Sequence, residues 1–362
     1  MPVLPGFPAG VNPALDYDRA AGVPSQVNGR EPLIAVCMAT YEPRLDLFEA
    51  QIESLRRQTY ARWTCVVSDD RTSPVAAHDL ARCLDGDSRF SLSTVPRRLG
   101  FYRNFERSLG LIPPDASYVA FCDQDDVWHS NKLETLAGRL ADESVMLAYG
   151  DMRVVSDRGH IVSETYWTTR PTAAGDLASL LITNTIPGAS ALFSASLLPV
   201  ALPFPPPVGD AYHDHWLACC ALALGRIAYE ARPLVDYVVH GDNVLGHAEP
   251  NSDRLARQVA GLVHALVSDD ARRRIAERLI EIHRDDVRRV RLMARTLERR
   301  CGTMLPRPKA RAVERIGRIE DSWLVLAWLL LRGLRNVPRL GETVGAEYAL
   351  AAAAAWNRLG RG

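Results

Sequence analysis

Apolar positions in the first half of the chain alternate between two patterns. Residues 33–38 (LIAVCM) form a continuous apolar run, which is typical of a strand buried on both faces. Residues 45–58 then repeat apolar side chains at helical spacing. Asn131 and Glu134 have the spacing of a capping box at the start of the helix predicted at 131–143. Further strands are predicted at 63–68, 89–95 and 118–122, and further helices at 75–84, 101–111 and 131–143. The alternation predicts an α/β fold with a mostly parallel sheet and helices on both faces.

The alternation loosens after residue 146. Strands are expected at 146–155 and 190–194, and a helix at 213–224. Residues 227–239 resemble a strand that Pro233 is expected to break. From residue 251 onward the chain is helical and rich in Arg.

The patterns divide the chain into three regions. We expect an N-terminal extended arm at 1–30, which is rich in Pro, Gly and Asn, a core domain at 31–248 and a helical C-terminal region at 251–362.

Composition places the chain among globular proteins. Its 362 residues are 47% hydrophobic and 24% charged, which excludes a disordered, collagen-like or disulfide-stapled chain. The seven cysteines have no CxxC spacing, as expected of reduced thiols in a cytosolic protein. We find no secretory signal and no run near the roughly 18–20 apolar residues that span a bilayer. These features predict a cytoplasmic protein.

Charge is divided unevenly between the regions, although 43 Lys+Arg balance 43 Asp+Glu over the whole chain. Residues 251–362 carry 23 basic and 13 acidic side chains, whereas residues 1–250 carry 20 basic and 30 acidic ones. The difference suggests that the two parts have different partners. No nucleic-acid-binding motif accompanies the basic part, so we expect no nucleic-acid partner.

Polar residues follow three of the predicted strands. These strands end in Thr40-Tyr41-Glu42, Asp69-Asp70 and Asp123-Gln124-Asp125-Asp126. Ligands of open parallel sheets bind beyond the carboxyl ends of the strands. Carboxylates that gather there repel one another unless a cation joins them, and their oxygens prefer Mg²⁺ or Mn²⁺. The sequence therefore predicts a metal–nucleotide site.

Structural alternatives exist for each acidic group. A turn or a helix cap also accounts for Asp69 and Asp70, because Asp favours both. A solvated turn explains residues 123–126 less well, because three Asp directly follow an apolar strand and precede Val127 and Trp128.

Several segments resemble family 2 glycosyltransferases and occur in the expected order. They are AVCMATY at 35–41, QT at 58–59, VVSDD at 66–70, NFER at 104–107 and FCDQDDVWHSNKLE at 121–134. The likeness is strongest to the bacterial rhamnosyltransferase-like members that build surface polysaccharide, and it spans about residues 32–246. It implies a GT-A-type nucleotide-diphospho-sugar-binding domain, which agrees with the alternation of strands and helices.

The resemblance implies donor-binding roles at the first two strand ends. Tyr41 is expected to stack on the nucleobase beside Thr40, and Glu42 adjoins them. Asp70, with Asp69 next to it, matches the acidic residue that binds the base or the ribose.

The resemblance also implies a metal site at the DxD motif. Asp125 is expected to bind Mn²⁺ or Mg²⁺ directly, and Asp123 to face the ribose or the metal, with Asp126 extending the motif. His240 matches a C-terminal histidine that meets the metal or the diphosphate, although a lone His after a strand is as often structural.

Other polar residues have weaker assignments. Asn104 is expected either to donate to the nucleotide or to cap a helix. Arg97, Arg98 and Arg103 could reach phosphate, although arginines on loops are more often solvated.

The segment YHDHW at 212–216 resembles the acceptor-side motif of the family, in which an acidic residue is the base. Asp214 is the expected base, because inversion at a sugar carbon needs a carboxylate that takes the proton of the acceptor hydroxyl. The alternative is that Asp214 caps the helix that follows. His213 stands where many relatives carry Glu, and Trp216 and Trp128 are expected on the acceptor side or in support.

The segment at 322–334 (SWLVLAWLLLRGL) is strongly apolar but only 13 residues long. Basic residues surround it over 307–339, which suits peripheral contact with the anionic inner face of the cell membrane. The alternative is a helical hairpin that packs on the catalytic domain or on a second subunit.

Together these features predict a metal-dependent inverting glycosyltransferase. The donor would be a UDP- or dTDP-sugar, with dTDP-rhamnose as one candidate, and the acceptor a glycan or lipid-linked hydroxyl. A nucleotidyltransferase acting on sugar phosphates would show a Gly-rich basic loop after the first strand, where residues 39–46 are ATYEPRLD. A non-catalytic sugar-nucleotide-binding scaffold is the other alternative, which the intact Asp125 and Asp214 disfavour.

Overall fold

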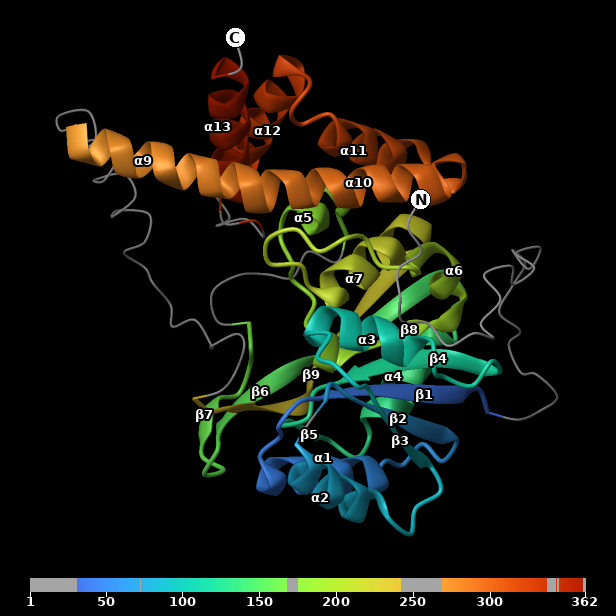
Figure 1. Cartoon of the computed structure of the whole chain (residues 1–362). Coiled ribbons are helices and arrows are strands. Elements are labelled where there is room, and N and C mark those ends of the chain that lie inside the picture. Colours follow the sequence, from blue (N-terminus) through green and yellow to red (C-terminus); the bar gives the residue numbers. More distant parts are fainter. Residues whose placement is uncertain are drawn as a thin grey trace.

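Figure 1 shows the computed structural model of the chain, which describes residues 31–71, 73–167, 175–241, 269–336, 343 and 345–360. The predicted arm at 1–30 and the predicted boundary between 248 and 251 lie outside the described residues. A single sheet lies at the centre with helices on both faces, and a layer of C-terminal helices lies over one of these faces (Figure 1).

The sheet is mixed, but most of its paired residues belong to parallel ladders. The strand order is β3-β2-β1-β4-β8-β6-β9-β5, and β7 pairs with β6. The strands are β1 Leu33–Thr40, β2 Trp63–Asp69, β3 Phe90–Thr94, β4 Ala116–Cys122, β5 Val127–Trp128, β6 Val145–Ser156, β7 Ile161–Ser163, β8 Ala191–Ser194 and β9 Arg226–Val239. The first four strands of the order run parallel, β8 is antiparallel to both of its neighbours, and β9 runs parallel to β6. The predicted α/β class is confirmed.

The parallel strands are the continuous apolar runs of the sequence. β1, β2 and β4 are buried over most of their length because helices cover both faces, and each begins and ends within two residues of its predicted range. The expected break at Pro233 is wrong, since β9 continues through it while its register against β6 shifts. A bulge of this kind accommodates a residue that has no N–H. The short strands β5 and β7 were not predicted.

Two helical layers enclose the sheet, and the buried side chains form one cluster on each face. α1 (Leu45–Arg56), α2 (Pro74–Leu84) and α4 (Lys132–Leu140) pack on one face. The helices of the opposite face are α3 (Phe101–Leu109), α5 (Leu177–Ile182), α6 (Leu198–Ala201) and α7 (His213–Leu224).

The helix starts follow local chemistry only in part. Ser73 caps α2, because its hydroxyl accepts a hydrogen bond from Ala76 N. The capping box predicted for α4 is wrong: Asn131 makes no capping bond, and Glu134 instead accepts from the hydroxyl of Thr59 at 2.6 Å.

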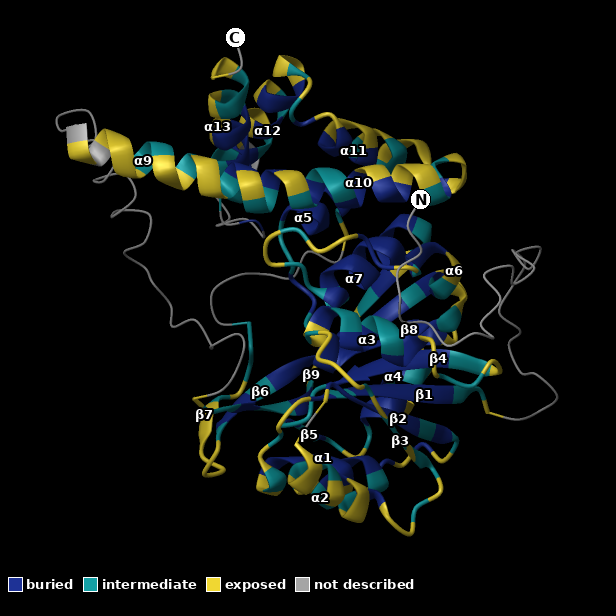
Figure 2. Ribbon diagram, viewed as in Figure 1, coloured by how far each residue is buried: buried dark blue, intermediate teal, exposed yellow. Residues whose placement is uncertain are grey.

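The C-terminal helices form a layer over α5 and α7 (Figures 1 and 2). They are α9 Asp269–Ile282, α10 Arg288–Cys301, α11 Arg307–Gly317, α12 Trp323–Asn336 and α13 Ala346–Leu359, with a π-helical turn, His283–Val287, between the first two. Leu297 and Ile316 belong to the same buried cluster as Trp216 of α7. Arg300 donates to the Val200 carbonyl at 2.7 Å. The helical region thus shares a hydrophobic core with the sheet domain (residues 31–241).

The apolar segment predicted at 322–334 forms α12, and one of its faces packs on this shared core. Gly333 lies against α13 so closely that a Cβ there would come within 2.7 Å of the Tyr348 ring. The buried hydrophobic residues of α12 are Val325, Leu326 and Leu329. Among the described parts of the chain, no helix has both the length and the apolar content to cross a bilayer.

Candidate active site

The carboxyl ends of β1, β2 and β4 lie side by side at one edge of the sheet. Thr40 pairs with Asp69 across β1 and β2, and Met38 pairs with Cys122 across β1 and β4. Asp123 follows Cys122 directly. The register therefore places the polar strand ends together, as the sequence predicted.

Asp69 and Asp70 are buried and already bound within the protein. Thr40 Oγ1 donates to Asp69 Oδ1 at 3.1 Å. The Asp70 carboxylate accepts from Leu99 N at 2.5 Å and from Gly100 N at 2.7 Å. Asp70 thereby holds the loop that leads into α3, and neither acidic residue is the N-cap of α2.

Asn104 lies inside α3 and ties the helix to the strand ends. Its Oδ1 accepts from Ser68 Oγ, and its Nδ2 donates to the Ser68 carbonyl, both at 2.7 Å. A longer bond of 3.5 Å runs from Nδ2 to the Thr40 carbonyl. The helix-cap alternative for Asn104 is wrong, because the N-cap of α3 is Gly100.

Arg107 is a positive charge beside Asp69 and Asp70 that the sequence analysis did not single out. Its guanidinium donates to Ser68 Oγ at 2.5 Å and to the Ser93 carbonyl at 3.1 Å. Burial lowers the pKa of Arg107 most, while the charges of Asp69 and Asp70 raise it. Its place in the NFER segment, one helical turn after the Asn, was the available signal.

Tyr41 is 38% exposed beside this edge. The Arg98 guanidinium carbon lies 3.6 Å from the centroid of the Tyr41 ring, within the range of a cation–π contact. Tyr41 N donates to Gln124 Oε1 at 2.8 Å, which joins the end of β1 to the DQDD segment. Glu42 has a positive φ of 41° and accepts from Ser73 N at 2.7 Å, so its carboxylate binds the start of α2.

Asp123, Asp125 and Asp126 follow β4, where burial raises the pKa of all three and neighbouring carboxylates raise those of Asp123 and Asp126 further. Burial raises the pKa of Asp123 to about 7, and the charges of Asp125 and Asp214 add to the rise. Burial also raises the pKa of Asp125, although His240 opposes this with Nε2 at 3.0 Å from Oδ2. The pKa of Asp126 rises well above its usual range, again mainly through burial. A bound cation would relieve this repulsion.

Residues behind the cluster fix its backbone. Asp126 Oδ1 accepts from Val238 N of β9 at 3.2 Å. The Lys132 Nζ lies 3.1 Å from the centroid of the Trp128 ring and donates to the Ala189 carbonyl. Burial lowers the pKa of Lys132 to about 7. Trp128 is only 2% exposed, so it supports the cluster from the core of the α1 face.

Asp214 is the second residue of α7 and accepts three N–H donors. Asn184 Nδ2 and His215 N donate to Oδ1 at 3.0 and 2.7 Å, and Gly188 N donates to Oδ2 at 2.9 Å. Burial raises the pKa of Asp214 to about 6, although these three bonds oppose the rise. The N-cap of α7 is Tyr212, but Asp214 still binds one amide of the first turn. Asp214 is therefore not the N-cap of α7, and its role as the base stays a prediction.

The loop before β8 was missed by the sequence analysis, yet it supplies two of these donors, Asn184 and Gly188. A Cβ at Gly188 would lie 3.0 Å from Asp214 Cβ and 3.2 Å from His213 Nε2. The close approach explains a glycine here. Nothing in the local pattern of the sequence signals it.

His213 and Trp216 support Asp214 from the core. The His213 ring stacks on Phe105, with centroids 3.7 Å apart, and burial lowers the pKa of His213 to about 3, so the ring is neutral. Trp216 is 1% exposed, and its Nε1 donates to the Ala201 carbonyl at 2.8 Å.

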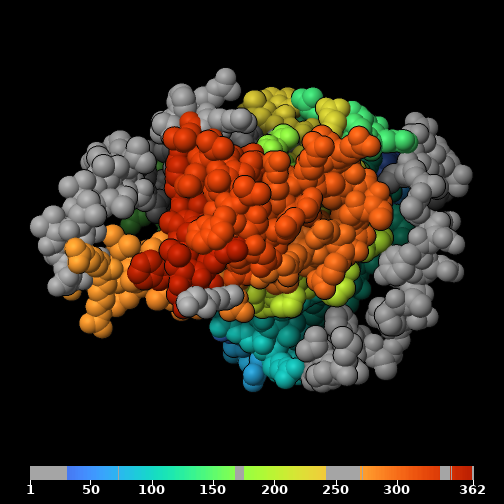
Figure 3. Space-filling view, turned by 90° about the horizontal axis from the view of Figure 1, so that it is seen from above, coloured from blue at the N-terminus to red at the C-terminus, as the bar shows by residue number. Residues whose placement is uncertain are grey.

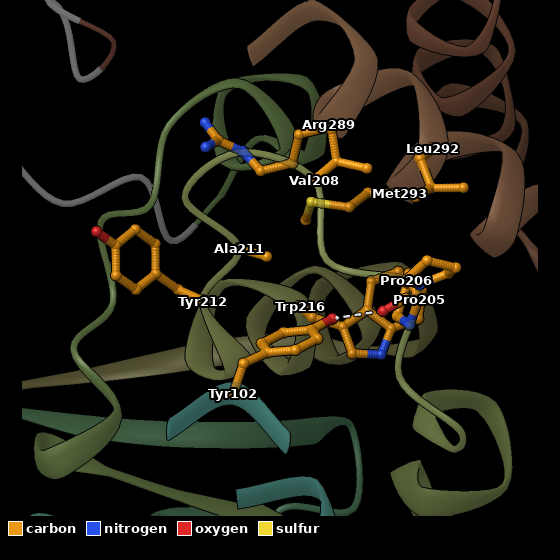
Figure 4. A pocket seen from close by; sticks show the side chains of 10 residues that line it. All are labelled: Tyr102, Pro205, Pro206, Val208, Ala211, Tyr212, Trp216, Arg289, Leu292 and Met293. Carbon is orange, nitrogen blue, oxygen red and sulfur yellow. Dashed lines mark hydrogen bonds between the residues drawn. The ribbon is translucent and has the colours of Figure 1, made fainter. Parts of the chain in front are cut away.

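A small pocket opens beside Tyr212, where α3 and α7 meet α10 (Figure 4). The Tyr102 hydroxyl in its wall donates to the Pro205 carbonyl at 3.1 Å. Its lining residues are Tyr102, Pro205, Pro206, Val208, Ala211, Tyr212, Trp216, Arg289, Leu292 and Met293. The lining is mainly apolar and contains none of the acidic residues, so this pocket is distinct from the acidic edge.

The residues predicted to hold a cation have suitable chemistry for a hard metal ion. Asp123 and Asp125 offer carboxylate oxygens, and His240 offers a ring nitrogen beside Asp125. Mg²⁺ is commonly bound by one or two carboxylates together with substrate phosphates. Within the described ranges, no three His, Cys, Asp or Glu side chains are arranged to hold a metal by themselves. The donor set therefore fits a metal that a diphosphate helps to bind.

Comparisons with known proteins agree with this arrangement. The sequence model of the family described as Glycosyl transferase family 2 matches residues 35–199. The chain is 28% identical over 125 residues to WfgD of Escherichia coli, named as UDP-Glc:alpha-D-GlcNAc-diphosphoundecaprenol beta-1,3-glucosyltransferase, with 34% of this chain and 47% of WfgD covered. It is 33% identical over 131 residues to the uncharacterized protein MT1568 of Mycobacterium tuberculosis (strain CDC 1551 / Oshkosh), with 36% and 40% covered. The chain thus spans about half the length, or less, of these curated relatives.

The fold is similar to that of a solved transferase. The structure of TarS residues 1–349 from S. aureus in complex with UDP-GlcNAc matches with a TM-score of 0.50 and 15% identity, and covers 91% of this chain and 92% of that one. At this identity the match shows the GT-A-type fold and no more. The stretch that matches the model of glycosyl transferase family 2, residues 35–199, contains β1, β2 and β4, so Thr40, Asp70 and Asp123 lie at strand ends of a segment that is similar to this family.

Proposed function

We propose that the chain is a metal-dependent, inverting glycosyltransferase of surface polysaccharide synthesis. It would move a sugar from a UDP- or dTDP-linked donor, with dTDP-rhamnose as one candidate, to a lipid-linked or glycan hydroxyl. The observation that carries this proposal is that the carboxylates proposed to bind the cation lie near the carboxylate proposed as the base. The Asp123 and Asp125 cluster is close enough to Asp214 for the Asp214 charge to raise the pKa of Asp123.

The donor would bind along the ends of β1 and β2. Tyr41 offers an aromatic ring for the base, and Arg98 already stacks against that ring. The Thr40, Asp70 and Asn104 network would set the shape of the nucleoside site through the backbone that it holds. The UDP-glucose in the name of WfgD supports a uridine donor.

Asp125 would hold Mg²⁺ or Mn²⁺, with Asp123 and His240 beside it. Such a cation supplies charge stabilisation for the departing diphosphate. The burial that raises the pKa of Asp123 would keep water from weakening this attraction.

Asp214 would be the base of a single displacement. Its carboxylate takes the proton of the acceptor hydroxyl while the acceptor oxygen bonds to the anomeric carbon and the bond from that carbon to the diphosphate breaks. Asn184, Gly188 and His215 hold the carboxylate in one orientation. Its pKa of about 6 leaves it ionised at neutral pH and still able to accept a proton.

The two alternatives make different predictions. A nucleotidyltransferase would use a phosphate loop after β1, and the family match disfavours it. A non-catalytic scaffold would bind the nucleotide through the same strand ends, so only an assay of turnover excludes it.

The first measurement is the Tm of the full chain with UDP, dTDP, GDP or CMP, each with and without Mn²⁺. A ligand at 100 times its Kd stabilises by about 2.7 kcal/mol, which raises the Tm of a chain of this size by a few degrees. We expect the shift only with UDP or dTDP, and only with Mn²⁺ present. If none of the nucleotides shifts the Tm, the proposed donor site is wrong.

Transfer is then measured with the donor class that shifts the Tm. Asp214→Asn is expected to lower the rate by roughly 100-fold to 10,000-fold while the nucleotide shift of Tm remains. Asp210→Asn, at an exposed Asp of the preceding loop, is the matched control and keeps the wild-type rate. A near wild-type rate for Asp214→Asn would remove Asp214 as the base, and nucleotide binding without any transfer would favour the scaffold.

A further inference from the structure

One face of α12 is apolar and exposed, and it is turned away from the core that the helix covers. The exposed fraction is 83% for Leu324, and it is 60% for both Leu331 and Leu334. Trp323 and Leu330 add to the same face at 48% and 44%. Their spacing of one, seven, eight and eleven residues from Trp323 is that of one helical face. Figure 3 shows that α12 and α13, in red, lie at the outer surface of the molecule.

The opposite face of α12 makes the contacts that attach this helix to the rest of the protein. Val325, Leu326 and Leu329 are buried, and Gly333 packs against Tyr348. No acidic residue occurs in α12 from Trp323 to its end. A contiguous exposed apolar patch marks an interaction site.

Arginines contact two tryptophans of α12, one of which, Trp323, belongs to this face. The Arg358 guanidinium carbon lies 5.0 Å from the centroid of Trp323, and that of Arg315 lies 5.1 Å from the centroid of Trp328. Arg311 of α11 and Arg318, which directly follows that helix, are exposed as well, although Arg318 pairs with Glu314 at 3.3 Å. Arginines around leucines, with a tryptophan at the border, are typical of a surface that meets anionic lipid headgroups.

We propose that the exposed face of α12, with its border of arginines, lies on the surface of an anionic bilayer. The helix has 14 residues, about 21 Å in length, which is too short to span and suits a position parallel to the surface. Arg332 binds Asp176 at the start of α5, so the face is fixed relative to the sheet domain. The use of this contact, which is to bring the active site to a lipid-linked acceptor, rests on the proposed function.

A second copy of the chain is a less suitable occupant. A twofold contact through this face would place the same arginines of both copies against one another. The described residues of 269–336, 343 and 345–360 carry 19 basic and 11 acidic side chains, so like charges would meet. An anionic bilayer offers the complementary charge.

The test is co-sedimentation of the full chain with two kinds of vesicle. One contains only phosphatidylcholine, and in the other phosphatidylglycerol makes up about one third of the lipid. We expect binding that is at least about tenfold tighter with the anionic lipid. The triple variant Leu324→Ser/Leu331→Ser/Leu334→Ser should bind on the order of 100-fold more weakly, because it removes the inserted apolar side chains. The control Val75→Ser/Val162→Ser changes two side chains that are also highly exposed, on α2 and β7, and should bind as the wild type does.

Lipids brominated on the acyl chain test the orientation. They should quench part of the tryptophan fluorescence, and Trp323→Phe should remove that part. Equal binding by the triple variant, or quenching that Trp323→Phe does not change, would overturn the proposal. A wild-type dimer in analytical ultracentrifugation that the triple variant turns into a monomer would overturn it in favour of a second copy.

The outcome is separable from that of the proposed reaction. The triple variant should keep the nucleotide-dependent Tm shift and the wild-type rate of transfer to a water-soluble acceptor, and lose rate only on acceptor presented in vesicles. Vesicle binding without any transfer would count against the proposed function alone. Transfer without vesicle binding would count against the bilayer contact alone.

Discussion

Two acidic groups lie at neighbouring strand ends of one sheet edge, and their surroundings differ in kind. Asp69 and Asp70, after β2, are bound to donors of the protein. The Thr40 hydroxyl donates to Asp69, and the amides of Leu99 and Gly100 donate to Asp70. This pair is part of the framework that holds the loop before α3.

In the group after β4, the contacts of Asp125 with His240 and of Asp126 with Val238 N do not outweigh the effect of burial. The pKa values of Asp123, Asp125 and Asp126 are all raised, with burial as the largest cause in each case. The charge of the nearby Lys132 opposes the rise for Asp123 and Asp126, but burial outweighs it and also lowers the pKa of Lys132 itself to about 7.

The comparison shows that acidic residues at a strand end are not equivalent evidence of a ligand site. An ionised carboxylate that accepts hydrogen bonds from backbone amides stabilises the fold. Ionised carboxylates that are buried beside one another lower the stability of the folded protein until a ligand such as a cation neutralises their charge. Such groups concentrate at functional sites.

The largest expected effect comes from replacing one carboxylate of each acidic group by the neutral amide of Asn. Asp123→Asn should lower transfer on the order of 100-fold, because it removes a carboxylate from the proposed cation site. The same variant should leave the Tm unchanged or raise it at pH 8, because it removes a charge that burial disfavours. Steady-state rates and thermal unfolding of the wild type and the variant measure both effects.

Asp70→Asn is the matched variant in the other group. Its amide would turn N–H donors toward the amide of Leu99 or Gly100, so we expect a loss of roughly 1–3 kcal/mol in the free energy of unfolding. If the two variants change stability in the same direction and by similar amounts, the distinction between the groups fails.

The sequence predicted the parts that depend on local pattern. Continuous apolar runs located β1, β2 and β4, and the polar residues after them met at one edge because parallel strands end together. The helix at 213–224 was predicted with the bounds that α7 has.

The sequence did not predict features that depend on contacts between distant segments. Asn184 and Gly188 lie 30 and 26 residues from the carboxylate to which they donate. The saturation of Asp70 by a loop 29 residues away could not be predicted either. The capping box failed at Glu134 because Thr59, from another element, competes for its carboxylate.

A smaller effect is expected at Gly188, whose amide donates to Asp214. In Gly188→Ala the new methyl would lie 3.0 Å from Asp214 Cβ and 3.2 Å from His213 Nε2, so Asp214, the proposed base, must move by a few tenths of an ångström. We expect transfer to fall roughly tenfold, because misplacing a reacting group by a fraction of an ångström slows the reaction. The Tm shift with donor nucleotide and Mn²⁺ should persist.

Gly138→Ala in α4 is the control, because a Cβ there would meet open space. It should keep the wild-type rate, and it should raise stability by up to about 1 kcal/mol as Ala replaces Gly in a helix. An equal loss of rate in both variants would mean that Gly188 does not act through Asp214.

The smallest expected effect is the pH dependence of stability. The pKa of Asp123 is about 7 and that of Asp214 about 6, against roughly 3.9 in the unfolded chain. Between about pH 4 and pH 7 the unfolded chain has lost these protons while the folded chain retains them. The free energy of unfolding therefore falls as the pH rises through this window. His213 acts in the opposite direction, because its lowered pKa of about 3 keeps the folded ring neutral while the unfolded ring takes up a proton below roughly pH 6.5.

Comparison with Asp123→Asn separates these contributions, because both proteins retain Asp214 and His213. The Tm of the wild type relative to the variant should decrease by a few degrees from pH 5 to pH 8 without divalent cation. Mn²⁺ should recover the difference at pH 8 and have little effect at pH 5, where protonated carboxylates bind metal weakly. A difference that stays constant from pH 5 to pH 8 would mean that Asp123 titrates like an exposed carboxylate. The group after β4 would then be no more strained than the pair after β2, and the cation site would lose its physical basis.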